Sequence, residues 1–262
     1  TYSDTITYGA KNGLSLIDLR GKSYDDPMWN DLLDQLTAED YYNIITCSGY
    51  GVPAIDSVGK PFVIDADTAS GLIYGGTGAM FPNMMTLAQT WNQDLALEYG
   101  TMIGNEAVIG GCDGWYAPSM NIHRTPFSGR NGEYYSEDPY LTGRIATAMV
   151  NGIQSNGVGT SIKHFAVNNQ ETNRTGTDAR LTPRALREIY LRGFEMVVKE
   201  ASPWTVMSSY NKINGEYASE SRDLLTTILR DEWGFSGLVM TDWFGGKNAP
   251  AQIHAGNDLL MP

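Results

Sequence analysis

The chain has 262 residues, of which 42% are hydrophobic and 18% charged, so it can bury a sizeable core and is not a disordered protein. Its net charge of −12 argues against a nucleic acid or an anionic membrane as a partner and suits a neutral substrate. No apolar run reaches the roughly 18 residues of a membrane span. The compartment is left open by this composition.

Up to residue 60, the sequence predicts one candidate strand and two short helices. The strand is Leu14–Leu19. Asp26-Pro27 begins the first helix, because Asp caps a helix terminus and Pro fits the first turn. A capping box with Asp in place of Glu opens the second helix, Thr37–Ile45.

From residue 61 onward, strands and helices alternate. The expected strands are Pro61–Ile64, Gly114–Ala117, Gly159–Ile162, Thr205–Ser209, Leu238–Thr241 and Asn257–Met261. The expected helices are one from Leu87 to Gly110, then Asp138–Ile153, Thr182–Val198 and Leu224–Trp233. The alternation predicts a parallel sheet and a (β/α)8 TIM-type barrel, irregular or incomplete at its termini, as one domain over residues 1–262. A doubly wound open sheet is the alternative, but its usual glycine fingerprint is absent after the first strand.

The cysteines and histidines indicate no metal or cofactor. Cys47 and Cys112 belong to no CxxC or Cys/His cluster, and they are either two buried thiols or one disulfide. The three histidines are scattered without neighbours at metal-ligand spacing. The chain begins with Thr1 rather than Met and stops at Pro262 just after an expected strand, so we expect it to be incomplete at both ends.

Polar side chains recur where the expected strands end, which is where catalytic residues cluster in a barrel. These residues are Asp67, Arg124, Lys163, His164, Tyr210 and Asp242. Their carboxylates and charged donors suit the hydroxyl groups of a sugar, and an aromatic ring such as Trp243 suits the C–H face of the sugar ring.

Several motifs, in the same order, resemble those of family-three glycoside hydrolases of the β-glucosidase type. Lys163–Glu171 is similar to the KHF…N-x-Q-E segment of that family. Asn121–Asp138 is similar to its R-x-P-x-x-G-R-N-x-E-x-x-S-E-D segment. Val206–Asn211 resembles its V-M-x-x-Y-N strand, and Val239–Trp243 resembles its nucleophile strand. The resemblance covers nearly the whole chain.

The resemblance implies a role for each candidate residue. Asp242 would be the nucleophile of a retaining mechanism and would form a covalent glycosyl-enzyme. The residues implied to hold the sugar hydroxyls are Asp67, Arg124, Lys163 and His164. Tyr210 would lie near Asp242, and Met207 and Trp243 would line the pocket, although both also suit a plain packing role.

The sequence departs from the family at one point and lacks one element. Asp67-Thr-Ala-Ser-Gly71 stands where members carry Asp-Gly-Pro, so Asp65 is an alternative match for Asp67. The general acid/base of the family is usually a Glu in a second, α/β sandwich domain, which we expect outside this chain as its partner. Arg130 is expected to hold its loop against Glu133, and Glu137 and Glu171 match positions that look structural.

The implied activity is the removal of terminal β-linked glucose, or a similar sugar, from a β-glucoside or a short β-linked oligosaccharide. A β-xylosidase or another exo-β-glycosidase is an alternative, and so is a sugar-binding barrel that is inactive without its partner domain. An N-acetylglucosaminidase is disfavoured, because the KHF segment continues as Ala166–Asn168 rather than as Pro-Gly-His.

Overall fold

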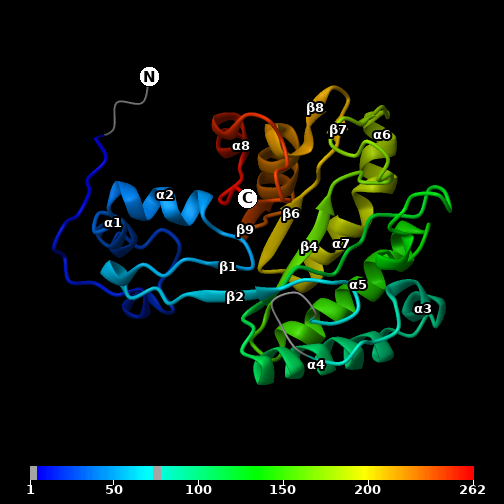
Figure 1. The fold of residues 1–262 in the computed structure, drawn as a ribbon, viewed down its shortest axis with the longest axis horizontal. Coiled ribbons are helices and arrows are strands. Elements are labelled where there is room, and N and C mark those ends of the chain that lie inside the picture. Colours follow the sequence, from blue (N-terminus) through cyan, green and yellow to red (C-terminus); the bar gives the residue numbers. More distant parts are fainter. Residues whose placement is uncertain (1–4, 73–77) are drawn as a thin grey trace.

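The amino-terminal part of the chain forms a small helical unit. The computed structural model describes residues 5–72 and 78–262, and this unit lies at one side of it (Figure 1). Its elements are a 3₁₀ helix Leu16–Leu19, α1 Met28–Leu33, α2 Ala38–Thr46 and a 3₁₀ helix Asp56–Val58. Its core consists of Leu19, Leu32, Leu36, Ile55 and Val58.

Both predicted helices of this unit are confirmed, and the predicted strand is wrong. The capping box before α2 is present, since the Thr37 hydroxyl accepts from the Asp40 N–H at 3.1 Å and the Asp40 carboxylate accepts from the Thr37 N–H at 2.8 Å. Leu14–Leu19 instead forms a 3₁₀ turn, because the Asp18 carboxylate accepts the Ser15 N–H at 2.8 Å and closes the backbone there.

A six-stranded sheet forms the centre of the described part of the chain. Its strands are β1 Gly51–Val52, β2 Val63–Ala66, β3 Gly114–Trp115, β4 Gly159–Phe165, β6 Thr205–Ser208 and β9 Leu238–Thr241. They lie side by side in the order β1-β2-β3-β4-β6-β9, antiparallel between β1 and β2 and parallel elsewhere. The order follows the chain without the reversal that defines a doubly wound sheet.

The sheet is curled and carries its large helices on one face, as in a barrel (Figure 1). The helices after β2 are α3 Met84–Gln89, α4 Gln93–Gly110, α5 Pro139–Gln154, α6 Pro183–Ala185, α7 Arg192–Ala201 and α8 Ala249–Ala255. Among the described residues, β1 and β9 are the two edges and do not pair with each other. The fold is therefore a TIM-type barrel that is incomplete, as the sequence predicted.

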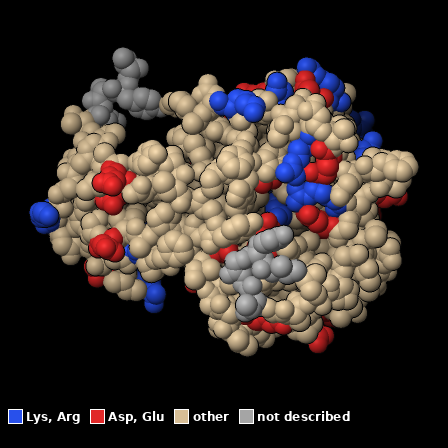
Figure 2. Space-filling model, in the orientation of Figure 1, with Lys and Arg blue, Asp and Glu red and all other residues tan. Residues whose placement is uncertain are grey.

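The carboxyl ends of the parallel strands share one edge of the sheet. Near the ends of β4 and β6, basic and acidic side chains lie together in a hollow of the surface (Figure 2). Close by, the loops form a small sheet of β5 Asp178–Ala179, β7 Lys212–Ile213 and β8 Glu216–Tyr217. The sequence predicted no strand in these segments, because two-residue strands carry no periodicity.

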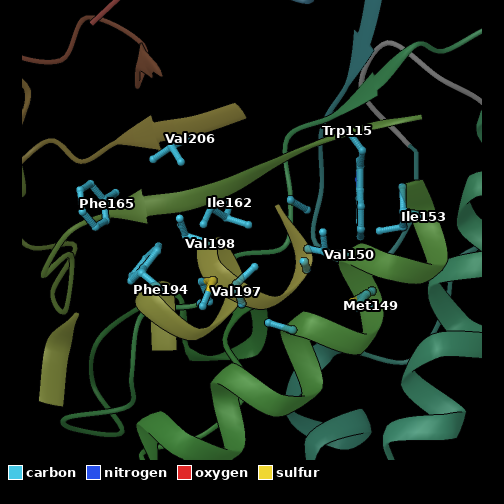
Figure 3. Packing of buried hydrophobic residues seen from close by; sticks show 14 of the residues in the cluster. Trp115, Met149, Val150, Ile153, Ile162, Phe165, Phe194, Val197, Val198 and Val206 are labelled. Atoms are coloured by element: carbon cyan, nitrogen blue, oxygen red, sulfur yellow. The ribbon is translucent and has the colours of Figure 1, made fainter. Parts of the chain in front are cut away.

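The strands bury both faces. On the helical face, Ile162 and Phe165 of β4 and Val206 of β6 pack against Phe194 and neighbouring residues of α7 and α5 (Figure 3). On the opposite, concave face, a second cluster contains Tyr116, Met207, Met240, Leu259 and Met261. Adjacent residues such as Val206 and Met207 thus belong to different cores, because strand side chains alternate between faces.

Several of the elements predicted after residue 60 differ in detail. The long helix from Leu87 is two helices, because Trp91 has a left-handed φ of 56° and Asn92 caps α4 by accepting the Leu95 N–H at 3.0 Å. Asn257–Met261 is no strand; only Leu259 bridges to Met240. The region 182–198 is helical, with a π-helical turn at Leu186–Tyr190 between α6 and α7.

The structure also bears on the last predicted helix and on the two cysteines. The helix predicted at Leu224–Trp233 is present as a π-helical segment, Asp223–Glu232. The expectation of two buried thiols is correct for Cys112 and wrong for Cys47, which is exposed. No helix of the described residues is both long and apolar enough to cross a membrane.

A close contact between α4 and α5 provides a stability test. A Cβ placed on Gly152 would collide with the Leu97 carbonyl oxygen and approach the Thr101 amide of α4. We expect Gly152→Ala to lower the free energy of unfolding by about 1–3 kcal/mol, the usual cost of overpacking, although alanine favours helices. Chemical denaturation measures this. Gly132→Ala is the control, because a Cβ there meets nothing within 4 Å. A Gly152→Ala variant as stable as the unmutated chain would contradict the close contact.

Candidate active site

The polar candidates meet at the carboxyl ends of three neighbouring strands. Lys163 and His164 belong to β4, which is longer than predicted and ends at Phe165. Tyr210 follows β6, and Asp242 follows β9. The register pairs Phe165 with Ser208 and Ser208 with Thr241, so the three strand ends lie level.

Asp242 is the buried carboxylate of this cluster, with only 7% of its surface exposed. Its Oδ1 accepts the backbone N–H of Trp243 at 2.8 Å. Its Oδ2 has no hydrogen-bond partner among the described residues and lies 3.6 Å from Nε2 of His164. One oxygen is thus fixed by the backbone, and the other is left for a further contact.

Opposing effects act on the ionisation of Asp242. Burial is the largest effect and raises the pKa of this carboxyl group above its usual range. The charge of Lys163, the Trp243 N–H, the charge of Arg130 and the Tyr210 hydroxyl act in the opposite direction and favour the carboxylate. The pKa of the Tyr210 phenol is also raised. Burial is the main cause, and the negative charge of Asp242 is the second.

His164 is a neutral imidazole, because it is only 1% exposed and cations surround it. Burial is the main cause that lowers its pKa well below the usual range, followed by the charges of Arg130 and Lys163. Its Nδ1 lies 3.3 Å from Oδ1 of Asn121 and 3.4 Å from the Tyr134 hydroxyl. The ring can therefore exchange hydrogen bonds with a ligand but carries no charge at neutral pH.

Lys163 distinguishes between the two candidate aspartates. Its Nζ is 2.6 Å from Oδ1 of Asp67, and the lysine side chain is only 4% exposed. Asp65 instead accepts the Tyr116 hydroxyl at 2.9 Å. The structure therefore brings Asp67, and not Asp65, to the Lys163 ammonium.

Two of the expected pocket residues pack on the concave face of the sheet. Met207 is buried in the cluster with Tyr116. Trp243 is half-buried, and its ring lies 5.2 Å from the ring of Tyr50 and 5.6 Å from that of Tyr116. Trp243 thus joins Asp242 to an aromatic cluster, and the packing role that the sequence left open applies to Met207.

The two predicted arginines differ in their surroundings. Arg124 is exposed, and its guanidinium lies 5.6 Å from the Tyr190 ring centre. Arg130 holds its loop as predicted, donating to both carboxylate oxygens of Glu133 at 3.0 and 2.7 Å. Its charge nevertheless acts on Asp242 and His164.

Arg174 is the member of the cluster that the sequence reasoning missed. Its guanidinium lies over the Tyr210 ring, 4.2 Å from the ring centre, and it donates to Oε2 of Glu171 at 2.7 Å. The available signal was the Glu-x-x-Arg spacing directly after the KHF segment. That spacing is common in sequences, so only the fold marks it as part of this cluster.

A cavity of about 310 Å³ lies beside the cluster, and Arg124, Asn168 and Asn211 are among its lining residues. A largely apolar cavity of about 340 Å³ is lined by Trp115, Thr160, Thr205 and Leu238. Thr205 and Leu238 begin their strands, so the cavity lies at the amino-terminal edge, opposite to Asp242. In the described residues, no group of three or more His, Cys, Asp or Glu side chains is placed to hold a metal ion. The Asp242 cluster thus offers carboxylates, an ammonium, guanidiniums and a neutral imidazole, which suit a hydroxyl-rich ligand.

Comparisons with known proteins identify a family and several relatives that this chain resembles. Residues 52–259 match the family model described as the glycosyl hydrolase family 3 N terminal domain. β-Glucosidase A of Butyrivibrio fibrisolvens is 47% identical over 223 residues, which are 84% of this chain and 27% of that protein. An exo-α-(1→6)-L-arabinopyranosidase of Bifidobacterium longum is 50% identical over 182 residues, 70% of this chain and 24% of that protein.

The fold of this chain also resembles that of a solved structure. β-Glucosidase 3B of Thermotoga neapolitana, in complex with glucose, superposes with a TM-score of 0.85 at 46% sequence identity. The match covers 89% of this chain and 36% of that one. The chain thus spans about a quarter to a third of the length of the proteins that it matches.

Burial of Asp242 predicts a pH-dependent gain in stability when its charge is removed. The native pKa is above the usual 3.8, so the stabilising neutral form is complete below pH 3.8 and is lost as the pH rises through the native pKa. We expect Asp242→Asn to have a higher Tm than the unmutated chain at pH 7, and this gain to shrink as the pH falls toward 4. Thermal unfolding at both pH values measures it. Asp231→Asn, at an exposed site, is the control. An equal change at every pH would contradict the assignment.

Proposed function

The chain belongs to glycosyl hydrolase family 3, and we propose on that basis that it is the barrel domain of an exo-acting, retaining β-glucosidase. Asp242 is the proposed nucleophile. The observation that carries the proposal is its buried carboxylate at the end of β9, with Oδ1 held at 2.8 Å by the Trp243 N–H and Oδ2 without a partner in the described residues.

In this mechanism, Asp242 attacks the anomeric carbon of the terminal sugar and displaces the aglycone, which forms a covalent glycosyl-enzyme. Water then releases the sugar with its configuration retained. Attack requires the carboxylate form, which burial opposes. The positive charges of Lys163 and Arg130 support the proposal because they favour that form.

The remaining cluster is proposed to bind the hydroxyl groups of the sugar. The ion pair between Lys163 and Asp67 places a donor and an acceptor side by side at 2.6 Å, which matches adjacent hydroxyls. The neutral ring of His164, whose Nε2 is 3.6 Å from Oδ2 of Asp242, suits a hydroxyl next to the anomeric carbon. Hydrogen bonds that tighten as the sugar distorts lower the barrier. Arg124, exposed against Tyr190, has no part in this proposal.

The general acid/base is proposed to come from a companion α/β sandwich domain, with residues 1–262 as a partial barrel. Retaining hydrolysis requires a second carboxyl group about 5–5.5 Å from the nucleophile. Glu133 and Glu171 each pair with an arginine at 2.7 Å, so both carboxylates are already engaged within their own loops. That the chain spans only 27% of the Butyrivibrio relative is compatible with such a domain.

A second candidate is exo-hydrolysis of an arabinopyranoside, because the Bifidobacterium relative at 50% identity carries that name. A panel of nitrophenyl glycosides that includes β-glucoside, β-xyloside and α-L-arabinopyranoside distinguishes these substrates. We expect the highest kcat/KM on the β-glucoside. A clear preference for the arabinopyranoside would replace the first candidate by the second.

We expect Asp242→Asn, in the protein that contains both domains, to reduce turnover of an aryl β-glucoside by at least about 10³-fold, since the variant has no nucleophile. Asp231→Asn is the charge-matched control and should retain full activity. A 2-fluoro-glucosyl fluoride should label the unmutated protein on the peptide that contains Asp242, as seen by mass spectrometry. Normal turnover in Asp242→Asn, or a label on another peptide, would refute the nucleophile.

An experiment with the isolated chain distinguishes catalysis from sugar binding alone. With an aryl glucoside whose leaving group needs little protonation, a lone nucleophile should still release a burst of aryl alcohol. We expect this burst from residues 1–262 alone. Glucose binding without any burst would favour a sugar-binding barrel over a catalytic one.

A further inference from the structure

Glu171 lies at the junction of two chains of contacts that both end at Asp242. It lies in the loop after β4, and its side chain accepts from Arg174 through Oε2 at 2.7 Å and from the Asn168 amide through Oε1 at 3.0 Å. Its backbone N–H also donates to the Ser128 carbonyl at 3.0 Å. Each carboxylate oxygen thus serves a different arm.

The first arm passes through Arg174. The guanidinium that Glu171 holds lies over the face of Tyr210, 4.2 Å from the ring centre. A cation at this distance from an aromatic face is attracted to it and restricts the ring. Tyr210 is the phenol whose hydroxyl acts on Asp242. Fixing Arg174 therefore fixes the position of that phenol.

The second arm passes through Asn168 and contains no charge. The Asn168 amide that donates to Glu171 also donates to the Tyr134 hydroxyl at 3.2 Å. That hydroxyl lies 3.4 Å from Nδ1 of His164, whose Nε2 faces Asp242 at 3.6 Å. Nδ1 also lies 3.3 Å from Oδ1 of Asn121, so Tyr134 and Asn121 together restrict the orientation of the ring and with it the direction of Nε2.

We propose that Glu171 is a positioning residue that holds both Tyr210 and His164 in place beside Asp242. It touches neither Asp242 nor the proposed sugar site, and acts through Arg174 on one side and through Asn168 and Tyr134 on the other. The inference rests on the proposed function, since it assigns a part in that reaction. Displacement of a reacting group by about 1 Å can cost about a hundredfold in rate, so such a brace affects kcat.

The test uses the full-length protein with an aryl β-glucoside. The variants are Glu171→Gln, Arg174→Ala and the pair together, with Tyr134→Phe for the second arm. Glu188→Gln is the matched control, because Glu188 also pairs with an arginine, Arg184, at 2.9 Å, but on an exposed surface. Measured are kcat, KM and Tm.

We expect Glu171→Gln to lower kcat by about tenfold to a hundredfold, with KM changed by less than about threefold. Gln still accepts from Asn168, so this variant cuts mainly the Arg174 arm. In the Arg174→Ala background, Glu171→Gln should then add little further loss. Tyr134→Phe should lower kcat through the other arm. Glu171→Ala, which also removes the acceptor for Asn168, should lower kcat further than Glu171→Gln, and this extra loss should disappear in the Tyr134→Phe background. Glu188→Gln should behave as the unmutated protein.

Multiplied losses for Glu171→Gln and Arg174→Ala would overturn the inference, because Glu171 would then act independently of Arg174. Loss of Tm in proportion to the loss of kcat would also overturn it and indicate a structural role. If Glu171→Gln fails to fold, Arg174→Lys, which keeps the charge but not the planar guanidinium, must show the same loss of kcat. Asp242→Asn separates the two proposals: its normal turnover refutes the proposed function, whereas an inactive Asp242→Asn beside a fully active Glu171→Gln refutes only this inference.

Discussion

The burial of one carboxylate is the constraint on which the site depends. Asp242 is 7% exposed at the end of β9, and an ionised carboxylate in such surroundings requires compensation. A backbone N–H satisfies Oδ1 directly, and Lys163 and Arg130 supply positive charge from neighbouring segments. These groups can converge because the parallel strands end at one edge of the sheet.

The cations of the site are themselves paired with carboxylates. Lys163 pairs with Asp67, Arg130 with Glu133, and Arg174 with Glu171. Burying a cation without a partner is costly, so the first two pairs let a positive charge act on Asp242, and the third holds Arg174 over Tyr210. The proposed nucleophile thus depends on residues well outside its own strand.

Much of the architecture could be read from the residues. Leu238–Thr241 was predicted with the bounds that β9 has, and the helix after Asp138-Pro139 is α5, because strong periodicity and a capping residue coincide there. Predictions failed where a local interaction competes with the pattern. Trp91 has a left-handed backbone conformation, which interrupts an apolar helical repeat. Asp18 stabilises a 3₁₀ helix in a segment whose pattern resembles a strand.

The sequence by itself determined the fold class, the approximate places of the strands and Asp242, Lys163, His164 and Tyr210 as members of a candidate cluster, because these follow from alternation along the chain and from motifs. The tertiary structure decided between Asp67 and Asp65, since only Asp67 contacts Lys163. Only the tertiary structure decided which arginines join them. Arg124 lies over Tyr190, whereas Arg174 lies over Tyr210 and Arg130 acts on Asp242. It also decided that Met207 packs in a core. The physical reason is that a loop residue's direction depends on contacts with segments far away in the chain, and no local pattern encodes those contacts.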